Sequence, residues 1–99
     1  MINEELFCVY ILTKKRRGTF YVGMTSNLPK RVWEHKNEVA DGFTKNYGIK
    51  TLVYYEVFDN PENAIRREKR LKKWPGAWKI KVIEEMNPEW KDLYDDICQ

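Results

Sequence analysis

The stretch "CVYILTKKRRGTFYVGMTS", residues 8–26, decides how the fold of this 99-residue chain begins. It holds two short runs rich in β-branched and aromatic residues, joined by a polar link that contains a glycine, which is the pattern of a β-hairpin. Each run carries a tyrosine, Tyr10 or Tyr21, and the link carries four consecutive cations. Tyrosine is common in strands for packing reasons alone, so the rest of the chain must decide whether these phenols have a chemical role.

Length and composition predict a single domain over residues 1–99, with a core over about 6–86 and an acidic C-terminal segment, 87–99. Cys8 and Cys98 lie at opposite ends without the spacing of a disulfide framework or a zinc site, which favours a reducing compartment. The N-terminus is acidic, and no apolar run approaches the roughly 20 residues of a membrane span. We therefore expect a soluble cytoplasmic protein with no membrane segment.

The net charge of +3 conceals an asymmetry along the chain. Residues 1–83 hold 17 Lys and Arg against 9 Asp and Glu, whereas residues 84–99 hold one Lys against 6 acids. Four basic clusters in one domain favour a polyanionic partner, with a solvated helix surface as the alternative for any one of them. The candidate nucleic-acid contacts are Lys14, Lys15, Arg16, Arg17, Lys30, Lys36, Arg67 and Lys72.

The predicted order of elements is ββαβαα. After the hairpin, Asn27 caps a helix over 28–40 that tolerates Pro29 in its first turn and should end near Gly42. A strand over 50–58 follows, and a second helix runs from Pro61 to about residue 74, where Pro75 and the next glycine stop it. Residues 77–86 read as a third helix, followed by a short acidic helix. This order indicates the α+β class, with helices packed on a small, largely antiparallel sheet.

The second helix carries a carboxylate where its apolar side should be. Helical spacing places 64, 65, 68, 71 and 72 on the side that faces the core, and residue 68 is a glutamate. Such a group is costly to bury unless it is paired, hydrogen-bonded or bound to a metal. Glu68 is therefore a candidate ligand for one Mg²⁺ ion, with an internal salt bridge, for example to Arg31, or a position at the edge of the apolar side as the alternatives.

The first helix places two polar side chains beside its own apolar side. We expect Leu28, Val32 and Val39 to be buried, with Arg31 and His35 one turn apart next to them. A guanidinium fork suits a phosphate group, and a phenol or the imidazole can orient or deprotonate water. Phosphodiester hydrolysis needs these parts together with a cation.

These residues resemble a known family. "CVY" (8–10) and "YVG" (21–23) are similar to the paired motif of GIY-YIG endonucleases, and Arg31 lies ten residues after Tyr21, as the family's catalytic arginine does. Glu68 in "AIRREKRLKKW" looks like its single metal-binding glutamate, and Asn87 in "MNPEW" is similar to its late supporting residue. The resemblance covers about residues 6–94 and is nearest to the small stand-alone bacterial branch.

The resemblance implies a three-stranded antiparallel sheet flanked by helices, with the active site on one face. It implies an endonuclease that cleaves DNA with one Mg²⁺ or Mn²⁺ ion, in DNA repair or recombination, on targets bound non-specifically or by their structure. The carried-over roles are catalytic for Tyr10, Tyr21, Arg31, His35 and Glu68, with Glu68 also the metal ligand, and supporting for Gly23 and Asn87.

The chain departs from the family pattern at several positions. Cys8 replaces a glycine, two valines replace isoleucines, and Met24 stands where excision-repair members carry a lysine that would favour a phenolate. Another cation must then act on the tyrosine. We favour Tyr10 over Tyr21 as the base, with His35 as helper or as an alternative base. Two other functions stay open: a non-catalytic nucleic-acid-binding module that keeps the fold, and an interaction domain that uses the acidic segment.

Overall fold

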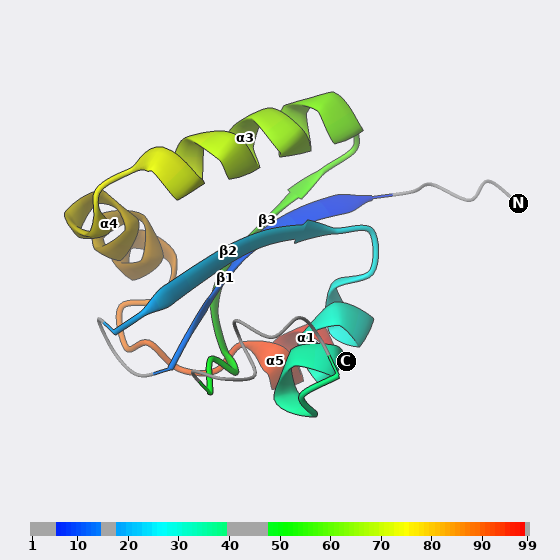
Figure 1. Ribbon diagram of the computed structural model, residues 1–99, viewed down its shortest axis with the longest axis vertical. Coiled ribbons are helices and arrows are strands. Elements are labelled where there is room, and N and C mark those ends of the chain that lie inside the picture. Colours follow the sequence, from blue (N-terminus) through cyan, green and yellow to red (C-terminus); the bar gives the residue numbers. More distant parts are fainter. Residues whose placement is uncertain (1–5, 15–17, 40–47, 99) are drawn as a thin grey trace, which may run out of the picture.

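A three-stranded antiparallel sheet forms the centre of the computed structural model, which describes residues 6–14, 18–39 and 48–98. The strands are β1 (Phe7–Thr13), β2 (Phe20–Thr25) and β3 (Thr51–Phe58), in the spatial order β2-β1-β3 (Figure 1). β1 pairs with β2 as the predicted hairpin, with Tyr10 opposite Gly23. The central strand is thus the first in the chain, and β2 and β3 are the two edges.

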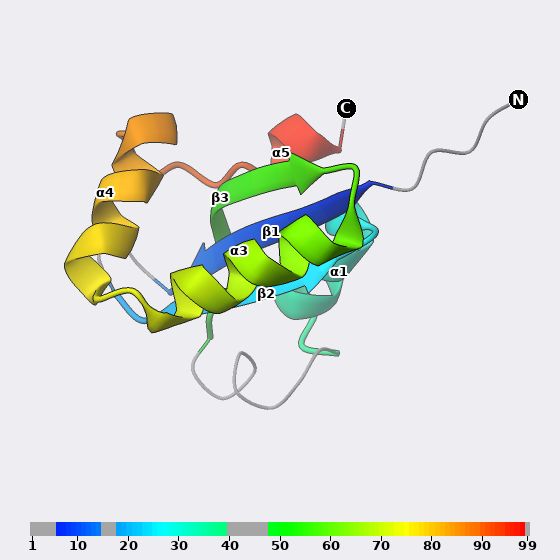
Figure 2. The ribbon, with the colours of Figure 1, turned by 90° about the horizontal axis from the view of Figure 1, so that it is seen from above.

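Helices cover both faces of this sheet. α1 (Leu28–Lys36) and α5 (Tyr94–Ile97) lie side by side on one face, whereas α3 (Pro61–Lys73) and α4 (Gly76–Met86) cover the other (Figures 1 and 2). The predicted α+β class and the order ββαβαα are confirmed, and the last short helix is α5. In residues 6–14, 18–39 and 48–98, no helix is long and apolar enough to cross a membrane.

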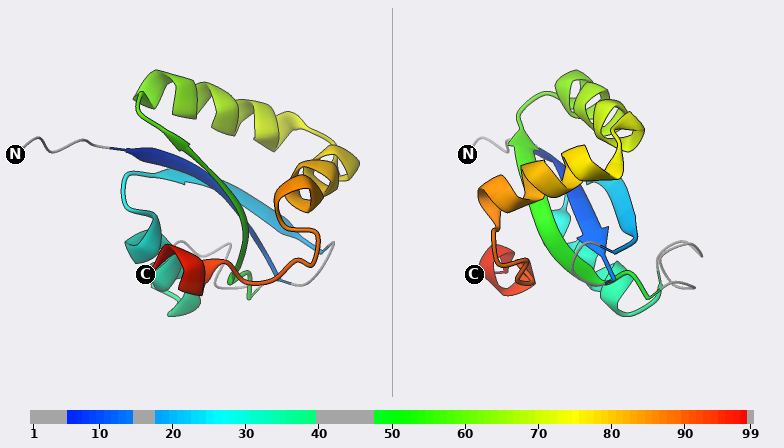
Figure 3. Two further views of the ribbon diagram at one scale, coloured as in Figure 1. Left: turned by 180° about the vertical axis from the view of Figure 1, so that it is seen from behind. Right: turned by 90° about the vertical axis from the view of Figure 1, so that its left-hand side faces the viewer.

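Two apolar cores form because successive residues of β1 point to opposite faces. Val9 and Ile11 pack under α3 and α4, whereas Tyr10 and Leu12 pack against α1 and the C-terminal segment. Figure 3 shows the two layers of helices from behind and from the side. Because Tyr10 belongs to the second core, the α1 face of the sheet is the one that presents the motif tyrosine.

A β-bulge in β3 disturbs the pairing with β1. The register shifts between Ile11, which pairs with Tyr54, and Leu12, which pairs with Leu52, so Val53 is the extra residue. Val53 and Tyr54 consequently both join the core under α3 and α4. The Leu52 backbone pairs with the C-terminal segment: its N–H donates to Asp92 Oδ1 at 3.2 Å, and its carbonyl accepts from the Leu93 N–H at 2.8 Å. The C-terminal segment therefore covers this part of the β3 edge.

The first helix is shorter than the sequence predicted. It begins after Asn27, whose side chain accepts from the Lys30 N–H as expected, but it ends at Lys36 and not near Gly42. Asn37 donates through Nδ2 to the Trp33 carbonyl at 2.9 Å, and Glu38 adopts a left-handed φ of 61°, which stops the helix. Val39 is 63% exposed, so the prediction that it is buried is wrong.

Candidate active site

Tyr10 and His35 form a buried pair between β1 and α1. Both residues are 1% exposed, and the Tyr10 hydroxyl oxygen lies 3.1 Å from His35 Nε2. Which of the two atoms donates depends on the histidine tautomer. Helical spacing placed His35 only beside the apolar side of its helix, so the burial of the imidazole against the motif tyrosine is a finding of the structure.

Gly23 lies directly beneath the Tyr10 ring. A β-carbon added at Gly23 would lie 2.5 Å from the Tyr10 hydroxyl oxygen and 2.6 Å from its Cζ atom. Carbon atoms in contact are ordinarily about 3.5–4.0 Å apart, so a larger residue at position 23 would push the phenol away. The motif glycine is therefore needed for a steric reason, because it leaves room for the side chain on the neighbouring strand.

Tyr21 completes a cluster of three rings on the α1 face. Its ring centroid lies 6.3 Å from that of Tyr10 and 5.2 Å from that of His35, and each pair of rings is tilted. Tyr21 is half-buried, whereas Tyr10 and His35 are closed off from solvent. Tyr21 is thus the ring of the cluster that solvent reaches.

Arg31 stands one helical turn before His35 and borders the same rings. Its Nη1 donates to Glu34 Oε1 at 3.1 Å, and its side chain is 32% exposed. Burial lowers the pKa of the Arg31 guanidinium, but hydrogen bonding with Tyr10 and Glu34 and attraction to the phenols outweigh that effect, so the pKa lies above its usual value. Arg31 is therefore a permanently charged, partly exposed cation beside the phenols of Tyr10 and Tyr21.

Glu68 lies on α3, on the opposite face of the sheet from these four residues. Its side chain is 20% exposed, and Oε2 lies 3.4 Å from Lys72 Nζ one turn along the helix. Glu68 thus forms a local ion pair with Lys72, in place of the expected alternative of an ion pair with Arg31. The neighbouring Arg67 donates through Nε to Glu56 on β3 at 2.8 Å. Since adjacent helical residues are about 100° apart, we infer that Glu68 lies on the β2 side of α3.

The apolar side of α3 is rotated relative to the prediction. Ala64 and Leu71 are buried, as expected, but Ile65 is 39% exposed and Lys72 is exposed. Arg67 and Glu68 are half-buried beside the buried pair. The helix therefore faces the sheet with positions 64, 67, 68 and 71, because Arg67 has a carboxylate partner on β3.

Asn87 holds the end of α4 against the sheet. It is 5% exposed, and Nδ2 donates to the Val53 carbonyl at 3.2 Å and to the Lys91 carbonyl at 2.8 Å, while Oδ1 accepts from the Lys91 N–H at 3.1 Å. Val53 is the residue that the β-bulge removes from pairing with β1, so Asn87 provides a donor for its carbonyl. Through these contacts, Asn87 stabilises the fold around β3.

Some of the candidate nucleic-acid contacts form ion pairs within the protein, whereas others are exposed to solvent. Lys36 ion-pairs with Asp92, and Arg67 is held by its carboxylate partner on β3 and by the Trp74 ring, 5.0 Å away. Lys14 and Lys30 are exposed, and Lys72 is exposed beside Glu68. Three further candidates lie outside the described residues: Lys15, Arg16 and Arg17.

Two groups near the candidate site went unnoticed in the sequence. Glu34 forms an ion pair with Arg31. The i, i+3 spacing of the two residues on one helix could have predicted this pair. The other group is a partly buried set of polar side chains on the α3 face, in which the Tyr54 hydroxyl donates to Glu56 Oε2 at 2.5 Å and Arg67 Nε donates to the same oxygen. Only the alternation of Tyr54 and Glu56 along the strand hinted at it.

Comparisons with known proteins agree with this fold. A family model described as the GIY-YIG catalytic domain matches residues 6–81. A UPF0213 protein of Clostridium perfringens is 39% identical over 75 residues, which cover 76% of this chain and 80% of that protein. A UPF0213 protein of Oceanobacillus iheyensis is 33% identical over 86 residues, covering 87% and 99% respectively. The solution NMR structure of a UPF0213 protein from Bacillus halodurans has a similar fold, with a TM-score of 0.56 at 24% identity and coverage of 88% and 92%.

Proposed function

Because the chain belongs to the GIY-YIG catalytic-domain family, we propose that it is a divalent-metal-dependent endonuclease that hydrolyses phosphodiester bonds of DNA. The observation that carries the proposal is the cluster of Tyr10, Tyr21, Arg31 and His35 on one face of the sheet. It combines a cation for a phosphate with titratable groups that can handle the proton of an attacking water.

Arg31 is the group that binds the scissile phosphate. Its guanidinium presents several N–H donors in a fixed plane, which fits two phosphate oxygens and remains charged at any working pH. One of these donors is bonded to Glu34 in the free protein. Binding of the substrate therefore includes a rearrangement of this pair.

Tyr21 is the tyrosine that we assign to the attacking water, because it is more exposed than Tyr10. This changes the preference drawn from the sequence, since the Tyr10 hydroxyl is buried and bonded to His35. Attraction to Arg31 favours the phenolate form of a neighbouring tyrosine, which can accept a proton from water. Tyr10 and His35 are then positioning residues that hold the cluster in place.

The family implies a divalent metal ion, and Glu68 is the residue that would hold it. Among the described residues, no three His, Cys, Asp or Glu side chains lie close enough to bind a metal together. A lone carboxylate fits Mg²⁺, which keeps several waters when bound, and the exposed Lys72 can leave its 3.4 Å contact. A bound ion would neutralise the negative charge that develops on the phosphate and the departing oxygen.

The position of Glu68 supports a site at the edge of the sheet. α3 packs mainly against β1 and β2, and β2 is an edge strand. A phosphodiester bound by Arg31 on the α1 face can therefore approach Glu68 around β2 without crossing the sheet. DNA would lie along this edge, held by exposed cations, of which Lys30 and Lys72 are candidates among the described residues. The protein would bind DNA non-specifically or select it by its structure. Its role would be in DNA repair or recombination.

Nicking of supercoiled plasmid with Mg²⁺ or Mn²⁺ tests the proposal. Glu68→Gln and Arg31→Ala should each lower the rate about a hundredfold or more, as loss of a transition-state contact does. Glu62→Gln is the matched control, because Glu62 is an exposed carboxylate on the same helix, and it should cut at the wild-type rate. Metal-dependent nicking that survives both substitutions would refute the assignment.

A non-catalytic module is the second candidate function, and the ion pair of Glu68 with Lys72 favours it. If the carboxylate keeps this partner, it is not a metal ligand. The two functions differ in binding and cutting: the module binds DNA with an affinity that falls steeply with salt, is unaffected by Glu68→Gln, and cuts nothing.

A further inference from the structure

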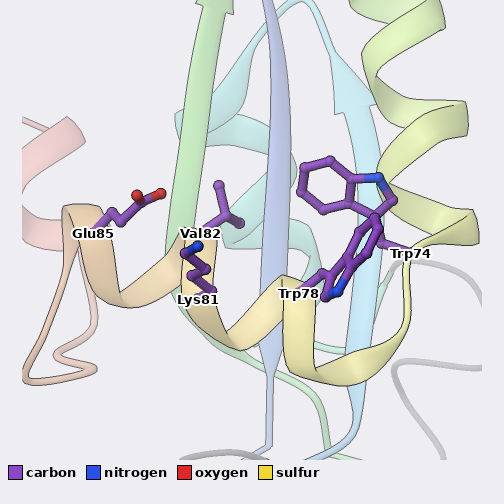
Figure 4. Close-up of a pocket in the computed structure, with 5 residues that line it drawn as sticks. All are labelled: Trp74, Trp78, Lys81, Val82 and Glu85. Carbon is purple, nitrogen blue, oxygen red and sulfur yellow. The ribbon is translucent and has the colours of Figure 1, made fainter.

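A groove of about 300 Å³ lies at the corner where α3 meets α4, on the face of the sheet that does not carry the ring cluster. Figure 4 shows two tryptophan rings side by side at this corner and a lysine and a glutamate farther along α4. The lining residues are Trp74, Trp78, Lys81, Val82 and Glu85. Neither the ring cluster nor Glu68 belongs to this groove.

The two indoles differ in how much of their surface is open. Trp74 ends α3, is half-buried, and has the Arg67 guanidinium 5.0 Å from its ring centre. Trp78 meets it edge-on at 5.6 Å between ring centroids and is 57% exposed. Trp74 is thus a fixed wall, and Trp78 is an apolar aromatic surface supported at one edge and open to solvent.

The surroundings of this open ring are basic. Residues 69–83 contain six Lys or Arg and no Asp or Glu. Lys81 lines the groove itself, and Lys79 Nζ lies 3.5 Å from the Lys72 carbonyl, which joins the basic end of α3 to α4. Glu85 is the single acid among the lining residues, and it lies a helical turn beyond Lys81. The charge around Trp78 therefore suits a polyanion.

We propose that Trp78 is a stacking site for an unpaired nucleobase, with the phosphates of the same strand lying on the cations of residues 69–81. The inference rests on the proposed function only in taking nucleic acid as the ligand. An exposed indole among cations matches the two parts of single-strand binding, which are aromatic stacking of bases and a positive surface for the backbone. An apolar protein partner would not account for the six cations of residues 69–83.

A duplex does not fit this surface in the same way, because its base faces are covered by their neighbours. The groove therefore gives the protein a preference for nucleic acid that contains an unpaired stretch, such as a flap, a loop or an end. Stacking is tolerant of sequence, since every base has an aromatic face.

The test measures binding without cutting. A fluorescein-labelled dT₁₂ is titrated in EDTA with wild type, Trp78→Leu and Trp78→Tyr, and affinity is read from anisotropy. Trp78→Leu keeps an apolar side chain but loses the aromatic face, so affinity should fall about five- to hundredfold, whereas Trp78→Tyr should lie near wild type. Trp33→Leu is the matched control, because Trp33 on α1 is also exposed, at 49%, and it should leave affinity unchanged.

Three results would overturn the proposal: equal affinity of wild type and Trp78→Leu, an equal loss in Trp33→Leu, or an acidic peptide that competes for Trp78 as strongly as dT₁₂. Failure of the proposed function is seen separately in the plasmid assay. If Trp78→Leu weakens dT₁₂ binding but the wild type shows no metal-dependent nicking, the stacking site stands and the nuclease function is refuted. If the wild type nicks plasmid but Trp78→Leu binds dT₁₂ as well as wild type, the nuclease function stands and the stacking site is refuted.

Discussion

Replacing Gly23 by alanine tests the steric basis of the motif. The added β-carbon would lie 2.5 Å from the Tyr10 hydroxyl oxygen, 2.6 Å from Cζ and 3.0 Å from Cε1. The phenol must then move by about 0.5–1 Å to regain ordinary contact. Tyr10 is 1% exposed and bonded to His35, so it has little room to move.

Two opposing effects set the magnitude of this change. Overpacking costs about 1–3 kcal/mol, and the lower backbone entropy of alanine in the unfolded chain offsets about 0.5–1 kcal/mol. We expect a net loss of about 1–2 kcal/mol in the free energy of unfolding, or roughly 5–15 °C in Tm for a domain of this size. A displacement of this size in the ring cluster should lower the nicking rate about tenfold to a hundredfold.

Urea unfolding and plasmid nicking would be measured for Gly23→Ala alone and in a Tyr10→Leu background. Leucine lacks the three ring atoms that the new β-carbon meets, so in that background Gly23→Ala should be neutral or stabilising. Gly76→Ala is the control, since nothing lies within 4 Å of a β-carbon at that position. Equal destabilisation by Gly23→Ala in both backgrounds would refute the steric account.

Three other substitutions test individual contacts of the structure. Burial raises the pKa of Tyr54 to about 12, above the unfolded value of about 10. The stability that the protonated phenol contributes is therefore complete below pH 10 and is lost between pH 10 and 12. In urea unfolding, wild type should lose up to about 2–3 kcal/mol of unfolding free energy over this range through Tyr54, and Tyr54→Phe should not show this loss. Asn87→Ala should cost about 1–3 kcal/mol by leaving the Val53 carbonyl without its donor, with little effect on cutting per folded molecule in the plasmid assay. Tyr10→Phe should lower stability by about 1 kcal/mol by removing the bond to His35, and a change in the imidazole titration by NMR would report the same loss; an unchanged titration would contradict the pairing.

Sequence periodicity and capping predicted the fold well because local signals agreed with one another. Asn27, Pro61 and Pro75 mark helix ends that the structure places within a residue or so of the prediction. The end of α1 was mispredicted because Asn37 and Glu38 stop the helix before the glycine that seemed the natural terminator. A left-handed non-glycine residue leaves no clear mark in a single sequence.

The candidate site was predicted in part. Spacing brought Arg31 and His35 to one patch, but the burial of His35 against Tyr10 depends on how α1 docks on the sheet, which periodicity does not encode. For Glu68, the break in the apolar pattern was real, since it is half-buried, yet its partner is Lys72 on the same helix. Long-range pairs such as Glu56 with Arg67 require the tertiary structure.

We propose that Glu68 and the ring cluster share one metal-bound site around the β2 edge. Paramagnetic broadening by Mn²⁺ tests it directly in side-chain NMR spectra of the wild type and Glu68→Gln. We expect substoichiometric Mn²⁺ to broaden the ring signals of Tyr21 and His35 in wild type, and Glu68→Gln to abolish this broadening. Broadening centred on the acidic C-terminal segment, or broadening of the rings that persists in Glu68→Gln, would contradict the claim.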